Sequence, residues 1–345
     1  MTKESGKSRL SLLVGDGRHG LFTLVLVALG AYLVICLLLG WFWSQQPRMF
    51  SVYDAAKERV PDMENRRITG AVTTATAIEV AEILLDKPGG YLRNDVLPPG
   101  VWLDNMPNWE YGVLQQQRDL MRVLRDSFSR SQSQSTEDSD LRLAEPQFSF
   151  RANSWIMPSS EGEYRKGIKY LKSYLARLAD PGNPDAQFYA RADNLRIWLE
   201  VVSARLGSLS QRLSASVGQT RINTDLAGDA EATQSTEKAR DVEVKTPWLE
   251  IDDVFYEARG ATWALIHYLK ALQYDFAEVL QKKNALVSVE QIVRELEQAQ
   301  DPIYSPMILN GTGFGMLANH SLVMASYISR ANAGLIDLQA LLSRG

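Results

Sequence analysis

The sequence has 345 residues, which is enough for a membrane anchor followed by one large domain or two small ones. The formal net charge is only −4, so the chain lacks the basic field of a nucleic-acid-binding protein and no nucleic-acid partner is expected. The only cysteine is Cys36, which leaves the rest of the chain without a disulfide bond or a zinc site of thiolate ligands.

The first predicted element is a membrane-spanning helix. The stretch Leu21–Trp43 contains 23 uncharged residues, and about 20 apolar residues are enough to cross a bilayer. The first twenty residues carry four basic and two acidic side chains, so the positive-inside rule places this tip in the cytoplasm. Aromatic residues at 41–43 end the span. We therefore expect a cytoplasmic tip at 1–20, a transmembrane helix at 21–43 and a juxtamembrane linker at 44–67.

Two cleaved signals are the alternatives to a retained anchor. A secretory signal has an apolar region of about 7–15 residues before a small-residue cleavage site. The one candidate site here, near Ala28–Ala31, is followed by a further long apolar run. A lipoprotein signal ending at Cys36 would need a small residue where Ile35 stands. The sequence thus departs from both signal patterns, which favours retention of the helix as an anchor.

Helical periodicity dominates the remaining chain, so we expect an all-α domain. The expected helices, in chain order, are 75–86, 108–129, 160–179, 184–213, 251–283, 287–300 and 315–342. The polar, aromatic-free segment 219–246 is predicted to be a flexible insertion, and 131–140 a loop. The best candidate for a short extended piece is 147–150.

Two stretches share a pattern that indicates an internal repeat. "VWLDNMPNWEYG" (101–112) and "PWLEIDDVFYEA" (247–258) each contain Trp-Leu-acid and an aromatic residue seven positions after the Trp. Each stretch is followed, farther along the chain, by acid-Pro-x-aromatic-Ser, at 145–149 and at 301–305.

The repeat predicts two related helical units, 68–182 and 183–345. Trp102 and Trp248 are expected to fill equivalent positions in the core of the two units. The two acid-Pro pairs are expected to begin equivalent helices, because an acid is stabilised at the positive end of a helix and proline fits its first turn.

The stretch "NGTGFG" places Gly311, Gly313 and Gly315 before the last predicted helix. Its spacing is not G-x-G-x-x-G, no strand pattern precedes it, and no Lys-Ser/Thr pair follows, so neither a dinucleotide site nor a P-loop is indicated. We expect a flexible connector. An anion site at the helix N-terminus is the alternative.

The other chemistry-bearing residues form no motif. None of the three histidines has a partner at metal-ligand spacing, and neither a catalytic triad nor a nucleophile elbow can be recognised. We therefore expect no metal, no cofactor and no catalytic residue. The aromatic helix containing Trp263 and His267 is predicted to be mostly core, with some side chains lining a groove.

Two blocks, "SVYDAAKERVPD" (51–62) and "GVWLDNMPNWEYGVLQQ" (100–117), together with the basic tip and the single anchor, resemble a family of proteobacterial inner-membrane proteins. This family is known as a domain of unknown function, DUF2333, and the resemblance extends over nearly the whole chain. It implies a location in the bacterial envelope and a mostly helical fold. Together with the basic tip, it leads us to expect an inner-membrane protein with the bulk of the chain in the periplasm. It implies no activity and no site residue.

Three functions are compatible with these features. The favoured hypothesis is a non-enzymatic scaffold or adaptor that binds a protein partner in an envelope assembly. The second is a module that binds a small or lipidic ligand in a pocket lined by the aromatic residues around Trp263. The third is a cell-wall or lipid hydrolase, which would need convergent acids such as Glu82 or Glu200.

Overall fold

The computed structural model describes residues 18–131, 136–182, 185–222, 241–305, 307–311 and 316–344. In this part of the chain the fold is all-α, as the periodicity predicts. The α-helices are α1 (Arg18–Trp43), α2 (Val52–Arg59), α3 (Ala71–Asp86), α4 (Asn105–Val123), α5 (Ser139–Phe148), α6 (Ser160–Ala179), α7 (Ala192–Ser214), α8 (Ile251–Asp275), α9 (Ala277–Lys282), α10 (Leu286–Gln298) and α11 (His320–Ser343).

Short turns and one hairpin complete the described structure. Single 3₁₀ turns occur at η2 (Pro61–Glu64), η3 (Gly100–Trp102), η5 (Ala215–Val217) and η6 (Trp248–Glu250), and α4 continues into a π turn, η4 (Leu124–Phe128). Strands β1 (Gln219–Ile222) and β2 (Asp241–Val244) pair antiparallel, with Gln219 opposite Val244.

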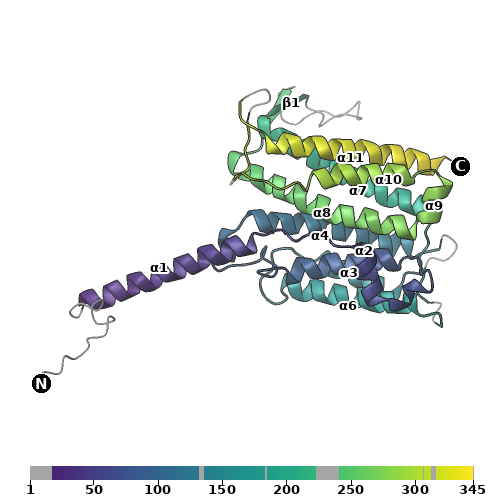
Figure 1. Cartoon of the computed structure of the whole chain (residues 1–345), viewed down its shortest axis with the longest axis horizontal. Helices are drawn as coiled ribbons and strands as arrows, with labels where there is room; N and C mark the ends of the chain where they lie inside the picture. Colours follow the sequence, from purple (N-terminus) through teal and green to yellow (C-terminus); the bar gives the residue numbers. More distant parts are fainter. Residues whose placement is uncertain are drawn as a thin grey trace, which may run out of the picture.

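The long helices lie side by side in a bundle, and α1 projects from one end of it (Figure 1). At the centre, α4 and α8 run in the same direction: Asn108 bonds to Asp253 near their first turns, and Gln117 accepts a hydrogen bond from the Tyr268 hydroxyl farther along. This pair connects the N-terminal and C-terminal halves of the domain.

Glycine permits the close approach of α4 and α8. A Cβ added to Gly112 would overlap the Glu257 carbonyl oxygen, and one added to Gly260 would overlap the Trp109 carbonyl oxygen. Any larger residue at either position would therefore push the two backbones apart.

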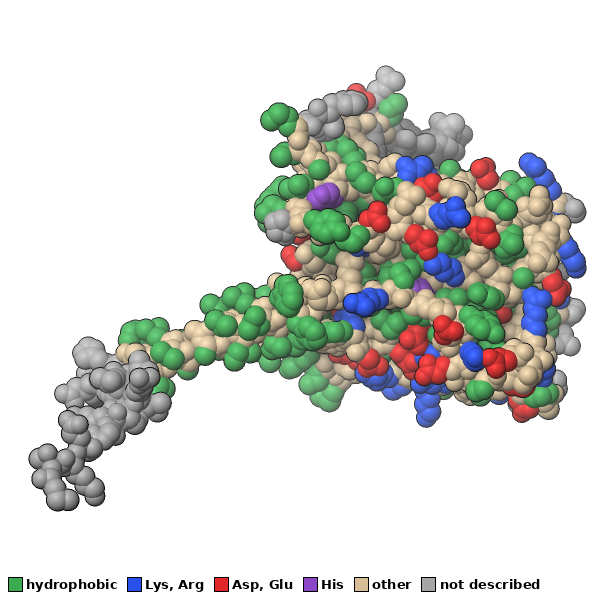
Figure 2. All heavy atoms as spheres, viewed as in Figure 1, with side chains coloured by type: hydrophobic (Ala, Val, Ile, Leu, Met, Phe, Trp, Pro, Cys, Tyr) green, Lys and Arg blue, Asp and Glu red, His purple; other side chains and the backbone are tan. Residues whose placement is uncertain are grey.

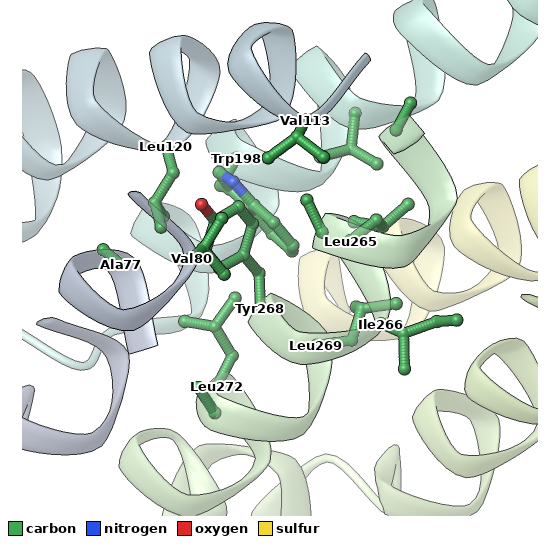
Figure 3. Close-up of a cluster of buried hydrophobic side chains, with 14 of the residues drawn as sticks. Ala77, Val80, Val113, Leu120, Trp198, Leu265, Ile266, Tyr268, Leu269 and Leu272 are labelled. Carbon is green, nitrogen blue, oxygen red and sulfur yellow. The ribbon is translucent and has the colours of Figure 1, made fainter. Parts of the chain in front are cut away.

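The core follows from the periodicity of each helix. In α6, Tyr164, Ile168, Leu171 and Leu175 are buried at helical spacing, which gives one apolar face. In contrast, α3 is buried on nearly all sides because it packs against α2, α4, α6 and α8. Figure 3 shows α3, α4, α7 and α8 meeting in the core, where the aromatic rings of Trp198 and Tyr268 lie among the branched aliphatic side chains.

The helix contacts of the two halves follow one order. In the first half, α3 packs on α6, α4 on α5, and α5 on α6; in the second, α7 packs on α11, α8 on α10, and α10 on α11. The division into units 68–182 and 183–345, and their duplication, stay predictions.

Several expected boundaries differ from the structure. Pro146 lies within α5 and Pro302 follows α10, so neither acid-Pro pair begins a helix. The end of the predicted loop (139–140) and the start of the predicted extended piece (147–148) both lie in α5. This helix begins there because Asp138 accepts hydrogen bonds from the backbone N–H groups of Asp140 and Leu141.

The linker and the insertion also contain regular structure. The linker contains α2, which buries Val52, Ala55 and Ala56 against the bundle. The described part of the insertion contains the β1–β2 hairpin, and residues 223–240 lie outside the described residues.

Candidate functional site at the α1 end of the bundle

Helix α1 is the described helix that is long and apolar enough to cross a membrane, over Leu21–Trp43. Most of its large side chains are exposed, on all sides of the helix. A helix that is apolar all round is stable in an apolar environment, and by length and composition it fits a membrane span or a signal sequence.

The last turns of α1 are in contact with the bundle. A Cβ added to Gly40 would lie 3.6 Å from the Leu103 side chain, and one added to Gly89 would lie 2.7 Å from the Trp43 ring. Gly89 has a φ of +86°, so glycine is favoured at this turn both by its backbone and by the tryptophan above it. The helix therefore meets the connection between α3 and α4.

The segment after α1 then runs along α8. The Gln46 side-chain oxygen accepts a hydrogen bond from Arg259 Nε at 3.1 Å. Phe50 follows, and its backbone N–H donates to His267 Nε2 at 3.1 Å. Successive residues of the linker thus contact successive turns of the central helix, and α1 is joined to the domain by a packed connection.

His267 and Trp263 form the centre of this connection. The His267 ring is buried and stacks on Phe50, with centroids 4.0 Å apart. Its Nδ1 lies 2.8 Å from the Trp263 carbonyl oxygen, so the tautomer that donates there leaves Nε2 as the acceptor for Phe50. Burial lowers the pKa of His267 to about 4, which keeps the ring neutral. Trp263 packs against Phe50 and Trp109. Neither Trp263 nor His267, which were the residues predicted to line a pocket, belongs to the wall of the cavity described below.

Trp102 and Trp248 lie at the surface, so the expectation that they fill the core is wrong. Their exposed fractions are 53% and 75%. Each belongs to a short 3₁₀ turn before a long helix, and Asp104 caps the first of these helices by accepting from the Asn105 N–H. Because both tryptophans precede the first residue of the helix, their side chains do not follow its buried face. The aromatic residues seven positions later, Trp109 and Phe255, are buried instead.

Other large apolar side chains are exposed at the same end. We call them the apolar loop face, which consists of Val96, Leu97, Val101 and Trp102; Trp155, Ile156 and Met157; Trp248 and Leu249; and Tyr304, Met307, Met316 and Leu317. In Figure 2, hydrophobic groups (green) gather along α1 and at the end of the bundle that it joins, whereas charged groups cover much of the visible flank.

One polar contact and one aromatic contact relate the loops of this face and the helix ends beside them. The Asn94 side chain donates to the Ser154 carbonyl oxygen, which joins the α3–α4 connection to the α5–α6 connection. Phe255 in the first turns of α8 contacts the ring of His320, the first residue of α11. The apolar loop face therefore consists of the segments that precede α4, α6, α8 and α11.

Sequence reasoning missed most of this face. Its residues show no periodicity, and several stand beside proline, as in Leu97-Pro98 and Met157-Pro158. A run of large apolar residues inside a proline-containing connection could have indicated an exposed apolar loop.

Gly311 is the described glycine of the stretch before α11. The Gly311 N–H donates to the Ala318 carbonyl oxygen, and the Asn319 side chain caps α11 by accepting from the Leu322 N–H. The Gly311 N–H and the Asn319 side chain are therefore both bonded to neighbouring backbone groups. Helix α11 begins at His320 rather than at the predicted residue 315. Gly313 and Gly315 lie outside the described residues.

A cavity of about 340 Å³ lies between α8, the α10–α11 connection and α11. Phe255, Arg259, Tyr304, His320 and Tyr327 contribute to its wall. This volume is within the range of small-molecule sites.

Arg259, in the wall of this cavity, is buried. Its guanidinium donates to the carbonyl oxygens of Ala299, Gln300 and Asp301, and burial lowers its pKa. These carbonyls end α10, so the cation stabilises the negative end of that helix.

The other buried charges have structural partners. Lys87 and Glu110 form a buried ion pair, and the Glu110 carboxylate also accepts from the backbone N–H groups of Leu92 and Arg93. Asp275 accepts from the Gly70 and Thr73 N–H groups at the start of α3.

The acids considered for a hydrolase belong to separate ion pairs. Glu82 pairs with Arg59 and Lys172, and Glu200 pairs with Arg196 on its own helix. The described residues also include no cluster of three or more His, Cys, Asp or Glu that could hold a metal ion. The geometry therefore gives no support to the hydrolase hypothesis.

A family model described as an uncharacterized protein conserved in bacteria (DUF2333) matches residues 17–345. No curated protein and no solved structure matches the chain.

Proposed function

Because the chain belongs to the DUF2333 family of uncharacterized bacterial proteins, whose description names no activity, we propose a function from the geometry. The protein is a single-pass inner-membrane protein, and its helical domain is a periplasmic scaffold or adaptor that binds a protein partner in an envelope assembly. The basic tip before α1 supports this topology through the positive-inside rule.

The packed junction between α1 and the bundle carries the proposal. Trp43 lies over Gly89, and Phe50 is bonded to and stacked on His267. A cleaved signal sequence has no need of a fitted contact with the mature domain. An anchor that is packed in this way holds the domain at a fixed orientation to the membrane, which suits a scaffold that presents its surfaces to a partner.

Topology is tested first by labelling single cysteines in cells. In a Cys36→Ser background, a cysteine at exposed Lys282 is expected to react with a membrane-impermeant maleimide in spheroplasts, whereas one at Ser8 reacts only after lysis. Protection of position 282 together with labelling of position 8 would reverse the orientation. Release of the domain from the membrane fraction would identify α1 as a cleaved signal.

The adaptor role is tested by crosslinking in intact cells, followed by purification of the full-length protein and mass spectrometry. The expected result is a reproducible, stoichiometric envelope protein. Recovery of the protein alone in repeated experiments would contradict the adaptor role and favour ligand binding.

The cavity beside Arg259 favours ligand binding as a second candidate function. Its aromatic wall suits a small or lipidic molecule. Native mass spectrometry should then detect a co-purified molecule, and Val323→Trp at the cavity wall should lower its occupancy. Ile336→Trp is the matched control, because both side chains are 53% exposed on α11 and only Val323 lines the cavity. Equal occupancy in both variants would reject the cavity as the site.

A further inference from the structure

We propose that the apolar loop face is a lipid-binding surface that enters the interfacial layer of the bilayer containing α1. This inference rests on the proposed anchor. It adds a second point of attachment, so that the domain lies against the membrane with the α1 end of the bundle in contact with lipid.

The depth of the face follows from its contact with α1. Gly40 precedes the end of the helix by three residues, which corresponds to about 5 Å along the helix axis. The neighbours of Gly40 are the side chains of Leu103 and Pro99. If α1 spans the bilayer, the 99–103 segment lies beside its last turn, at the depth where lipid headgroups meet acyl chains.

The chemistry of the face suits this layer. Tryptophan and tyrosine are enriched at membrane interfaces because their rings are apolar and their N–H and O–H groups remain hydrated. The face contains Trp102, Trp155, Trp248 and Tyr304, each more than half exposed. Exposed aliphatic neighbours, such as Ile156, would gain free energy by leaving water.

The concentration of these residues is confined to one end. Among the described residues outside α1, the linker, the hairpin and the apolar loop face, the exposed large apolar residues are Leu143, Tyr274, Val287, Val323 and Ile336. Val323 lines the cavity, and the other four lie on four different helices. Single exposed apolar residues of this kind are ordinary, whereas a contiguous patch marks a binding surface.

The charges near the face indicate which lipid interaction operates. Asp104, Glu250 and Asp253 lie where α4 and α8 begin, whereas Arg93 and Arg151 lie in the first two connections, so the described charges at this end include no excess of basic groups. These acids would be repelled by anionic lipid headgroups. Contact therefore depends on insertion of apolar side chains into a zwitterionic interface, and is expected to change little with salt.

Spin labels on the full-length protein test the proposal. Single cysteines in a Cys36→Ser background are placed on the face at Met157, Trp248 and Met316, and a matched control is placed on the flank at Ile336. The protein is reconstituted into phosphatidylcholine nanodiscs. Collision rates with oxygen, which concentrates in lipid, and with a water-soluble nickel chelate are then measured for each label.

The expected result is a several-fold higher oxygen-to-nickel collision ratio for the three face labels than for the Ile336 label. A label at Leu29, within α1, serves as the reference for the membrane core. Face labels that match the Ile336 label, with a lipid-like Leu29 label, would overturn the lipid-binding face and leave the anchor standing. A water-exposed Leu29 label would reject the anchor and the face together.

Discussion

Phe50 and His267 are joined by two different contacts. The Phe50 N–H donates to His267 Nε2 at 3.1 Å, and the two rings stack at 4.0 Å with an angle of 13° between their planes. The hydrogen bond requires a neutral imidazole with a free lone pair on Nε2. The connection between the α1 helix and the bundle is therefore sensitive to the protonation state of one side chain.

His267 is expected to make the folded state less stable as the solution becomes acidic. The pKa of His267 is lowered from 6.5 to about 4, so between these values the unfolded chain binds a proton that the folded chain does not. This contribution is complete above pH 6.5 and is lost as the pH falls toward 4. At pH 5 the loss should be about 2 kcal/mol.

The measurement compares urea unfolding of the wild type and His267→Gln between pH 5 and pH 7.5, in the same detergent. Glutamine can still accept from the Phe50 N–H but does not titrate. The wild type should lose stability relative to the variant as the pH is lowered. A difference that is constant with pH would reject the assignment.

Asp275 is expected to contribute in the opposite direction. Burial raises the pKa of Asp275 to about 6, although the Thr73 and Gly70 N–H groups act against this increase. Between about pH 4 and 6 the folded state therefore binds a proton that the unfolded state does not, and the contribution of Asp275 falls as the pH rises through 6. Asp275→Asn should cost about 1–3 kcal/mol, with the larger loss at low pH.

The same unfolding experiment, run from pH 4.5 to pH 7.5, tests this trend. Exposed Asp337→Asn on α11 is the control and should change stability by less than about 0.5 kcal/mol. A loss for Asp275→Asn that increases with pH would contradict the raised pKa.

Alanine substitutions at glycine should separate the α4–α8 contact from an ordinary helix position. Gly112→Ala places a Cβ against the Glu257 carbonyl oxygen, and should cost about 1–3 kcal/mol through overpacking. Gly207→Ala in α7 has only the Asn332 amide nearby, at 3.7 Å, and should stabilise by about 0.5–1 kcal/mol because alanine is the better helix former. Thermal unfolding of both variants should give shifts of opposite sign, and a stabilising Gly112→Ala would reject the close contact.

The two tryptophans of the first repeat pattern should differ strongly in their effect on stability. Trp102→Ser removes an exposed ring and should change the unfolding free energy in detergent by less than about 0.5 kcal/mol. Trp109→Ala removes a fully buried ring and should cost about 3–5 kcal/mol. Urea unfolding measures both, and a large loss for Trp102→Ser would restore the predicted core position.

The local features of this fold were predictable. The apolar run at 21–43 predicts α1, and the amphipathic pattern of 160–179 gives the bounds of α6 as the structure has them. The Pro-Gly pair at 88–89 predicts the end of α3 near Asp86. Each of these predictions depends on interactions among residues within a few positions of one another.

The site was less predictable. The sequence places His267 on an aromatic helix, but the partner that explains it, Phe50, is more than two hundred positions away in the chain. Trp102 and Trp109 stand on the same predicted stretch, and only their distance from the α4–α8 contact decides which ring is buried.

By itself, therefore, the sequence determined that the chain is helical and that it begins with an apolar helix long enough to cross a membrane. These properties arise from side-chain periodicity and hydrophobicity, which are local. The tertiary structure alone decided that the linker packs along α8, and that four connections place exposed apolar side chains at the α1 end. Such a surface exists only when helices distant in sequence begin at the same end of the bundle, because loops carry no periodicity that reports what lies beside them.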